Sequence, residues 1–142
     1  MSADYSQLTE FTRNLERLND AQKDQFFKEC CKELAARLLS KVVRRTPSSS
    51  GVLRRGWTAG SGNAVAYANS LEVRKVGNTY QVDIINPVEY ASYVEYGHRT
   101  RNHTGWVEGK FMLTISEQEL SAMTDRILQR KLENYLRDVF GR

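Results

Sequence analysis

The spacing of apolar residues changes period twice along this chain, and this change restricts the fold more than any other feature of the sequence. Helical spacing between residues 20 and 45 is carried by Phe27, Cys30, Cys31, Leu34, Leu38 and Val42. Alternation at period two follows over residues 70–85, and helical spacing returns after residue 111. The sequence therefore predicts an α+β fold, in which a long N-terminal helix and a C-terminal helix pack on a small, mostly antiparallel β-sheet with long loops.

The length and composition fit one domain. The 142 residues include 40% hydrophobic and 27% charged residues, which are ordinary proportions for a globular chain. We therefore expect residues 1–142 to form a single domain. No apolar run approaches the roughly 20 residues of a membrane-spanning helix, and the first residues lack the basic and then apolar order of a secretory signal. These observations predict no membrane partner and assembly in the cytoplasm.

Capping signals predict where the helices begin and end. Asn19 and Gln22 form a capping box at the start of the long helix, and Pro47 disfavours helical backbone at the residue before it. We expect this helix to cover residues 20–45, after a first helix over residues 5–18.

The C-terminal helix carries two overlapping capping boxes. These are Thr114 with Glu117, and Ser116 with Glu119. They predict that the helix begins near residue 114.

One β-hairpin is predicted between the long helices. Its strands are residues 70–75 and 79–85, and Gly77 and Asn78 supply the residues of a tight turn. A lone two-stranded ribbon is marginally stable in water, so we expect it to be covered by helices or completed by further strands.

The segment after this hairpin is predicted to contain a short helix over residues 90–96 that ends at Gly97. Residues 98–109 are polar and basic, and we expect an exposed loop there. Its one large aromatic residue, Trp106, is expected to be covered, because an uncovered tryptophan in water is unfavourable. We favour a contact with a neighbouring subunit, and packing on the core is the alternative.

Residues 46–66 match neither period and are rich in glycine and serine. We predict a loop there and expect its part over residues 48–66 to be mobile in the free subunit and to order on assembly, because it has little apolar surface. Leu53 and Trp57 are the exceptions. We favour Trp57 packing on the core beside Leu53, and a contact with a partner is the alternative.

Positive charge is concentrated in the same segment. The net charge is +4, and the stretch over residues 44–62 contains Arg44, Arg45, Arg54 and Arg55 but no carboxylate. Uncompensated positive charge favours an anionic partner, either DNA phosphate or an acidic protein face, and a solvated loop is the alternative. We expect Arg54 and Arg55 to lie on a surface used in assembly. Replacing both with glutamate is expected to preserve the fold and prevent assembly.

A catalytic or metal site has weak support. Glu95, His98 and His103 form the one candidate set for acid–base or metal chemistry, but no further ligand recurs at a metal-like spacing. Cys30 and Cys31 are neighbours in a helix, where adjacent side chains diverge by about 100°, so we expect two reduced thiols. We predict that the protein is not an enzyme and binds no cofactor. Glu95 is expected to accept hydrogen bonds from backbone donors in the glycine loop that follows it, or to pair with an arginine.

Two motifs in this chain resemble those of a known family. The first motif comprises Thr46-Pro47, Gly51, Leu53-Arg54 and Trp57, and the second comprises Asn86-Pro87, Tyr90-Ala91, Tyr93-Val94-Glu95 and Gly97-His98. Together they resemble the neck and tail-completion proteins of long-tailed bacteriophages and prophages, which are head–tail joining proteins. The resemblance covers nearly the whole chain.

The resemblance implies a structural virion protein of the head–tail junction, located in the tail or neck and assembled in the cytoplasm of the bacterial host. It implies a ring of identical subunits, a hexamer, that completes or caps the tail and joins it to the head connector. The implied neighbours are head-connector, tail-terminator or tail-tube proteins, with non-specific contact to DNA in the channel. Tail completion and tail termination both stay open, because Ser50 stands where many members have an aspartate.

The candidate residues for assembly contacts are Arg54, Arg55, Trp57, Tyr93, Glu95, Gly97, His98, Arg99 and Trp106. The alternative function is that of a small nucleic-acid-binding protein, in which the arginine-rich loop contacts the phosphate backbone and Trp57 stacks on bases. Tight DNA binding that weakens steeply with salt would indicate the alternative.

Overall fold

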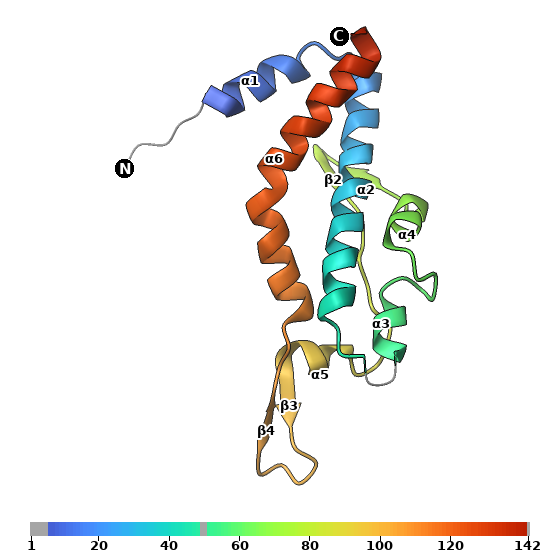
Figure 1. The fold of residues 1–142 in the computed structure, drawn as a ribbon, viewed down its shortest axis with the longest axis vertical. Coiled ribbons are helices and arrows are strands. Elements are labelled where there is room, and N and C mark those ends of the chain that lie inside the picture. The colour runs from blue at the N-terminus through green and yellow to red at the C-terminus, as the bar shows by residue number, and fades with distance from the viewer. Residues whose placement is uncertain (1–5, 49–50, 142) are drawn as a thin grey trace.

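The computed structural model of the protein describes residues 6–48 and 51–141 (Figure 1). Its elements are, in chain order, α1 (Ser6–Leu15), α2 (Asp20–Arg45), α3 (Val52–Gly56), α4 (Ala64–Ser70), β1 (Arg74–Val76), β2 (Thr79–Gln81), α5 (Ala91–Tyr96), β3 (Gly97–Arg99), β4 (Trp106–Glu108) and α6 (Met112–Phe140). The α+β prediction is confirmed. Within the described ranges, no helix is both long enough and apolar enough to cross a membrane.

The two long helices, α2 and α6, lie side by side and run in opposite directions (Figure 1). α2 begins as predicted: Asn19 Oδ1 accepts a hydrogen bond from the Gln22 backbone N–H (2.8 Å), and the Gln22 side chain accepts one from the Asn19 N–H (2.9 Å). It also ends as predicted, at Arg45, because Thr46 has extended backbone. The cluster that packs α1, α2 and α6 together contains Leu18, Phe26, Cys30, Leu132 and Leu136.

α1 is shorter than predicted. It ends at Leu15, whereas the prediction extended it to Leu18, which is buried in the turn that follows. Residue 5, the predicted first residue, lies outside the described ranges.

The two cysteines are free thiols, as predicted. Burial raises the pKa of the Cys30 thiol to about 12, and burial also raises the pKa of Cys31. Both thiols are therefore protonated at neutral pH, and a protonated thiol is a poor nucleophile.

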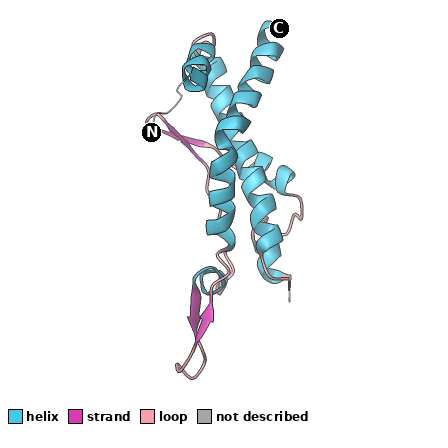
Figure 2. Ribbon diagram, turned by 60° about the vertical axis from the view of Figure 1, so that its left-hand side comes forward, coloured by secondary structure: helices cyan, strands magenta, loops and turns pink. Residues whose placement is uncertain are grey.

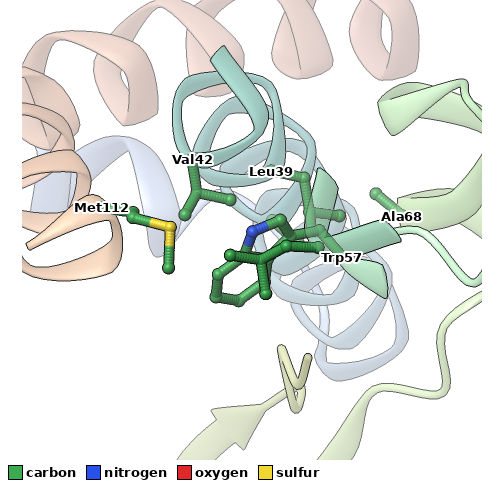
Figure 3. Close-up of a cluster of buried hydrophobic side chains, with 7 residues drawn as sticks. Leu39, Val42, Trp57, Ala68 and Met112 are labelled. Atoms are coloured by element: carbon green, nitrogen blue, oxygen red, sulfur yellow. The ribbon is translucent and has the colours of Figure 1, made fainter. Parts of the chain in front are cut away.

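A second apolar cluster surrounds Trp57, where α2, α3, α4 and α6 meet (Figure 3). Its buried members are Ala35, Leu39, Val42, Leu53, Trp57, Ala68 and Met112. Trp57 is only 4% exposed, and its indole Nε1 donates to Thr46 Oγ1 (2.9 Å). Thr46 in turn donates to the Val42 carbonyl (2.6 Å). The expected burial of Trp57 is therefore confirmed.

The prediction of an irregular loop over residues 46–66 is wrong in part, because α3 and the first residues of α4 lie within it. Gly51 precedes α3 with left-handed backbone (φ 74°), a conformation that glycine adopts without steric cost. Leu53 and Trp57 are both buried, so the segment has more apolar surface to offset ordering than its glycine and serine content indicated. Residues 49 and 50 lie outside the described ranges.

Hydrogen exchange tests whether this segment is ordered in the isolated chain. The N–H groups of Arg55, Trp57 and Thr58 donate to carbonyls of Gly51, Arg54 and Arg55. We expect these amides to exchange at least about 100-fold more slowly than those of the exposed hairpin loop over residues 101–104, because they open only when the Trp57 cluster opens. Equal exchange rates in this segment and in residues 101–104 would indicate a mobile loop, as the sequence predicted.

The strands form two separate two-stranded antiparallel sheets. In the first, β1 pairs with β2, and Val76 lies opposite Thr79, so the turn lies at Gly77 and Asn78 as predicted. Each strand covers three residues and is shorter than predicted. Tyr80 attaches this hairpin to α2 by donating its hydroxyl to Asp24 (2.7 Å) and by stacking on Phe27 at 5.4 Å between ring centroids.

The second hairpin, β3–β4, was not predicted, and the expected loop over residues 98–109 is wrong in part. His98 lies opposite Val107, and Arg99 lies opposite Trp106. The helix before it was predicted correctly, since α5 ends at Gly97. Figures 1 and 2 show that this hairpin extends beyond the ends of α2 and α6, away from the body of the molecule.

Candidate assembly surface

The protruding end of the molecule carries the largest concentration of exposed apolar side chains. We call it the aromatic end, and it comprises Tyr90, Tyr93, Tyr96, Trp106, Val107 and Phe111. Tyr96 is 63% exposed and Trp106 is 56% exposed. Large apolar groups gathered in this way on a surface mark interaction sites.

Two glycines hold the aromatic end in shape. Gly97 ends α5 with a φ of 89°, which is unfavourable for other residues. A Cβ atom at Gly109 would lie 2.5 Å from the Glu95 carbonyl oxygen and 2.6 Å from the Tyr96 carbonyl carbon, so only glycine fits there. The backbone then crosses α5 closely, because the N–H of Lys110 donates to the Val94 carbonyl (2.7 Å).

Replacing Gly109 with alanine should therefore distort the aromatic end. We expect a loss of about 2 kcal/mol or more in the free energy of unfolding, because the new methyl group would meet backbone atoms that cannot rotate away. Gly105→Ala in the same hairpin is the matched control, since the nearest atom there is a threonine methyl carbon at 3.2 Å. Thermal unfolding of both variants checks the prediction, and equal melting temperatures would contradict it.

Glu95 connects the aromatic end to the long C-terminal helix. Its side chain is 6% exposed, and its carboxylate accepts hydrogen bonds from the backbone N–H groups of Leu113 (2.8 Å) and Thr114 (3.0 Å). The Thr114 hydroxyl donates a third bond (2.8 Å). The helix dipole also stabilises the negative charge of this carboxylate at the first turn of α6. Glu95 thus acts as the N-terminal cap of a helix that begins 17 residues further along the chain.

This arrangement corrects two predictions. Glu95 accepts hydrogen bonds from backbone donors, but they belong to α6 rather than to the loop at Gly97. The predicted capping boxes at Thr114 and Ser116 are also wrong, because α6 begins at Met112 after Phe111, whose backbone is left-handed (φ 47°).

The aromatic side chains lie on both faces of the β3–β4 hairpin. His98 and Val107 are directly opposite each other and share one face, where Tyr93 packs against His98 at 5.5 Å between ring centroids. Trp106 and Arg99 share the other face. Tyr93, His98, Arg99 and Trp106, which the sequence predicted as contact residues, all lie at this end of the molecule.

The set of Glu95, His98 and His103 does not form an acid–base site. The Glu95 carboxylate accepts hydrogen bonds from α6, and His98 Nδ1 lies 2.8 Å from the Arg99 carbonyl oxygen. His103 is an exposed residue of the hairpin loop. Across the described residues, no group of three potential ligands could hold a metal ion.

Arg44 and Arg45 are the last two residues of α2, and Arg54 and Arg55 lie in α3. Arg45 donates to the Glu119 carboxylate of α6 (2.5 Å), and this hydrogen bond is the main cause of the lowered pKa of Glu119. The expectation that none of the arginines has a carboxylate partner is therefore wrong for Arg45. Arg54 is held by a hydrogen bond from Nε to the Thr46 carbonyl (2.7 Å).

A hollow of about 300 Å³ lies between α2, α3 and the start of α4. Arg44, Arg54 and Arg55 line it, and among the described residues none of its lining side chains is a carboxylate. We call it the arginine hollow. The charge in this hollow is available to an anionic group.

The two sequence motifs contact each other in the fold. Asn86 Nδ2 donates to the Leu53 carbonyl (2.7 Å), while Asn86 Oδ1 accepts from the Val88 N–H (3.1 Å). A Cβ atom at Gly56 would collide with Asn86 Oδ1, so a larger residue there would displace the Asn86 side chain from its hydrogen bonds. Asn86 therefore fixes α3 against the segment that leads to α5. The sequence placed Asn86 in the second motif without predicting its role, and it did not indicate a role for Gly109, because both roles depend on contacts between distant segments.

Residues 9–97 match a family of proteins described as "Bacteriophage HK97-gp10, putative tail-component". No curated protein and no solved structure matches the chain. The matched residues make up more than half of the chain, and they include α3, α5, the first motif and the second motif as far as Gly97. The chain therefore belongs to the HK97-gp10-like family of bacteriophage tail components.

Proposed function

We propose that this protein is a structural component of the head–tail junction, where identical subunits form a ring that completes or caps the tail and joins it to the head connector. The observation that carries the proposal is the aromatic end: exposed aromatic side chains on a protruding hairpin that backbone contacts and the Glu95 cap fix to both α5 and α6. A fixed apolar projection suits a permanent contact between subunits or between rings.

The family supports this proposal in general terms, since it is described as a tail component. We further propose that the ring is a hexamer, that its neighbours are head-connector, tail-terminator or tail-tube proteins, and that it touches channel DNA without sequence preference. We place the protein in the virion tail or neck after assembly in the host cytoplasm. We also propose that it is not an enzyme. The Glu95 carboxylate, the candidate acid–base group, is occupied in hydrogen bonds with backbone N–H groups at the start of α6.

The alternative of a nucleic-acid-binding protein is less well supported. That alternative requires Trp57 to stack on bases, but Trp57 is buried and its Nε1 donates a hydrogen bond to the Thr46 hydroxyl. Of the arginines in the proposed loop, Arg45 is paired with Glu119. Trp57 is therefore not free to stack on bases, although Arg44, Arg54 and Arg55 could still contact phosphate.

Electron microscopy of lysates tests the proposal. A phage that lacks this protein should yield filled heads and separate tails, and supplying the wild-type chain should restore joined particles. The double variant Tyr96→Ala/Trp106→Ala should fail to restore them while remaining folded, because both side chains are more than half exposed. The matched control Val76→Ala/Ile85→Ala truncates two equally exposed apolar residues elsewhere and should restore joining. Normal joined particles without the protein would overturn the proposal.

A further inference from the structure

The molecule carries opposite charges on two different sides of α2, near the same end of the helix pair. One is the arginine hollow, formed by the C-terminal part of α2 with α3 and α4. The other is the N-terminal half of α6, where residues 111–125 contain Glu117, Glu119 and Asp125 but no lysine or arginine. Figure 1 shows α6 on one side of α2, whereas α3 and α4 lie on the other side of α2.

The carboxylates on this half of α6 differ in what they contact. Glu119 faces α2, where it accepts a hydrogen bond from Arg45 and lies 3.9 Å from Lys41. Glu117 precedes it by two residues, or about 200° around the helix, and therefore points away from α2. Asp125 is also exposed, and its backbone lies about 12 Å further along the helix axis than that of Glu117. Within the described part of the chain, neither Glu117 nor Asp125 has an ion-pair partner.

The arginines of the hollow are the complementary group. Arg44 uses its Nε to donate to the Ser40 carbonyl (3.2 Å), and Arg54 uses its Nε to donate to the Thr46 carbonyl (2.7 Å). These bonds orient both guanidinium groups, and their terminal nitrogens have no carboxylate partner among the residues described. Oriented guanidinium groups are well suited to bind carboxylates.

We propose that the arginine hollow of one copy of this chain receives the N-terminal half of α6 from a second copy, so that Glu117 and Asp125 pair with the arginines of the hollow, which are Arg44, Arg54 and Arg55. The inference rests on the proposed ring and names the contact that closes it. Because the two surfaces are different and lie on different sides of one molecule, the contact is head-to-tail, and repeated rotation by the same angle closes a ring.

Charge reversal with mixing tests this contact. The variant Arg44→Glu/Arg55→Glu has two acidic surfaces, and the variant Glu117→Lys/Asp125→Lys has two basic ones. At about 50 mM salt, each variant alone should self-associate at least about 100-fold more weakly than the wild-type chain, because like charges would face each other. An equimolar mixture should recover assembly, with the two variants alternating. Native mass spectrometry measures the masses of the resulting oligomers directly.

The control is Arg126→Glu/Arg130→Glu, which makes the same charge change on the C-terminal half of α6 and should leave self-association within about threefold of wild type. A wild-type chain that stays monomeric at low salt, or variants whose mixture stays dissociated although both fold, would overturn the inference. Either result would leave the head–tail joining test unaffected. Conversely, a lysate without a joining defect would overturn the proposed function even if mixing restored assembly.

Discussion

Glu95→Ala is expected to lower the free energy of unfolding by about 3 kcal/mol and the melting temperature by roughly 10 °C. The reason is that the buried carboxylate is the partner of the Leu113 and Thr114 N–H groups and of the Thr114 hydroxyl. Alanine would leave these donors at the start of α6 with no carboxylate partner and would leave space where the side chain was. Because Glu95 also lies in α5, the same change should loosen the aromatic end.

Two further variants separate the cap from general damage. Glu95→Gln retains one acceptor oxygen and loses the charge. It should therefore lower the free energy of unfolding by about half as much as Glu95→Ala. Glu89→Ala removes an exposed glutamate from the same segment and should change stability by less than about 0.5 kcal/mol. Denaturant unfolding followed by circular dichroism gives all three values. If Glu95→Ala and Glu89→Ala were equally stable, Glu95 would not be the cap of α6.

Trp57→Ala is expected to lower the free energy of unfolding by about 3–5 kcal/mol. This is a large part of the roughly 5–15 kcal/mol by which a typical domain is stable. Trp57 fills the space between Leu39, Val42 and Met112 (Figure 3), and its indole also binds the Thr46 hydroxyl. Alanine would leave a cavity where α2, α3, α4 and α6 meet. α3 should be the first element to lose protection from hydrogen exchange.

Trp106→Ala is the matched control, because it makes the same side-chain change at a site that is 56% exposed. It should cost less than about 1 kcal/mol in unfolding experiments. Trp57→Phe should fall between the two tryptophan-to-alanine variants, since the ring is largely retained and the hydrogen bond to Thr46 is lost. Equal effects of Trp57→Ala and Trp106→Ala would contradict the observed difference in burial.

The elements that could be predicted are those whose signals are local. The capping box at Asn19 and Gln22 and the proline at position 47 define α2, and both of its ends agree with the prediction. Gly77 and Asn78 define the first turn in the same way. Each of these signals involves residues a few positions apart, so the sequence contains the whole interaction.

The features that could not be predicted depend on distant contacts. α6 has capping boxes of its own, but Glu95 provides the cap from 17 residues upstream, so the helix starts earlier than the local signal indicated. The β3–β4 hairpin lacks the two-residue turn signal that Gly77 and Asn78 supply in the first hairpin, because residues 100–105 connect its strands. Arg45 lacked a carboxylate among its sequence neighbours and finds one 74 residues away, in Glu119.

The candidate site was predicted in part for the same reason. Tyr93, His98, Arg99 and Trp106 were selected from one continuous segment, and the structure brings them together on one projection. Trp57 was selected with them but lies in the core. The glycine at position 109 was missed, because its requirement comes from the α5 backbone that crosses it.

Antibody labelling of purified particles, viewed by electron microscopy, tests the central claim most directly. We expect the label at the end of the tail next to the head, on every intact particle, and we expect the protein to remain with the particles through density-gradient purification. Its absence from purified infectious particles, or labelling at the distal tip of the tail, would contradict the proposed place of this protein in the virion.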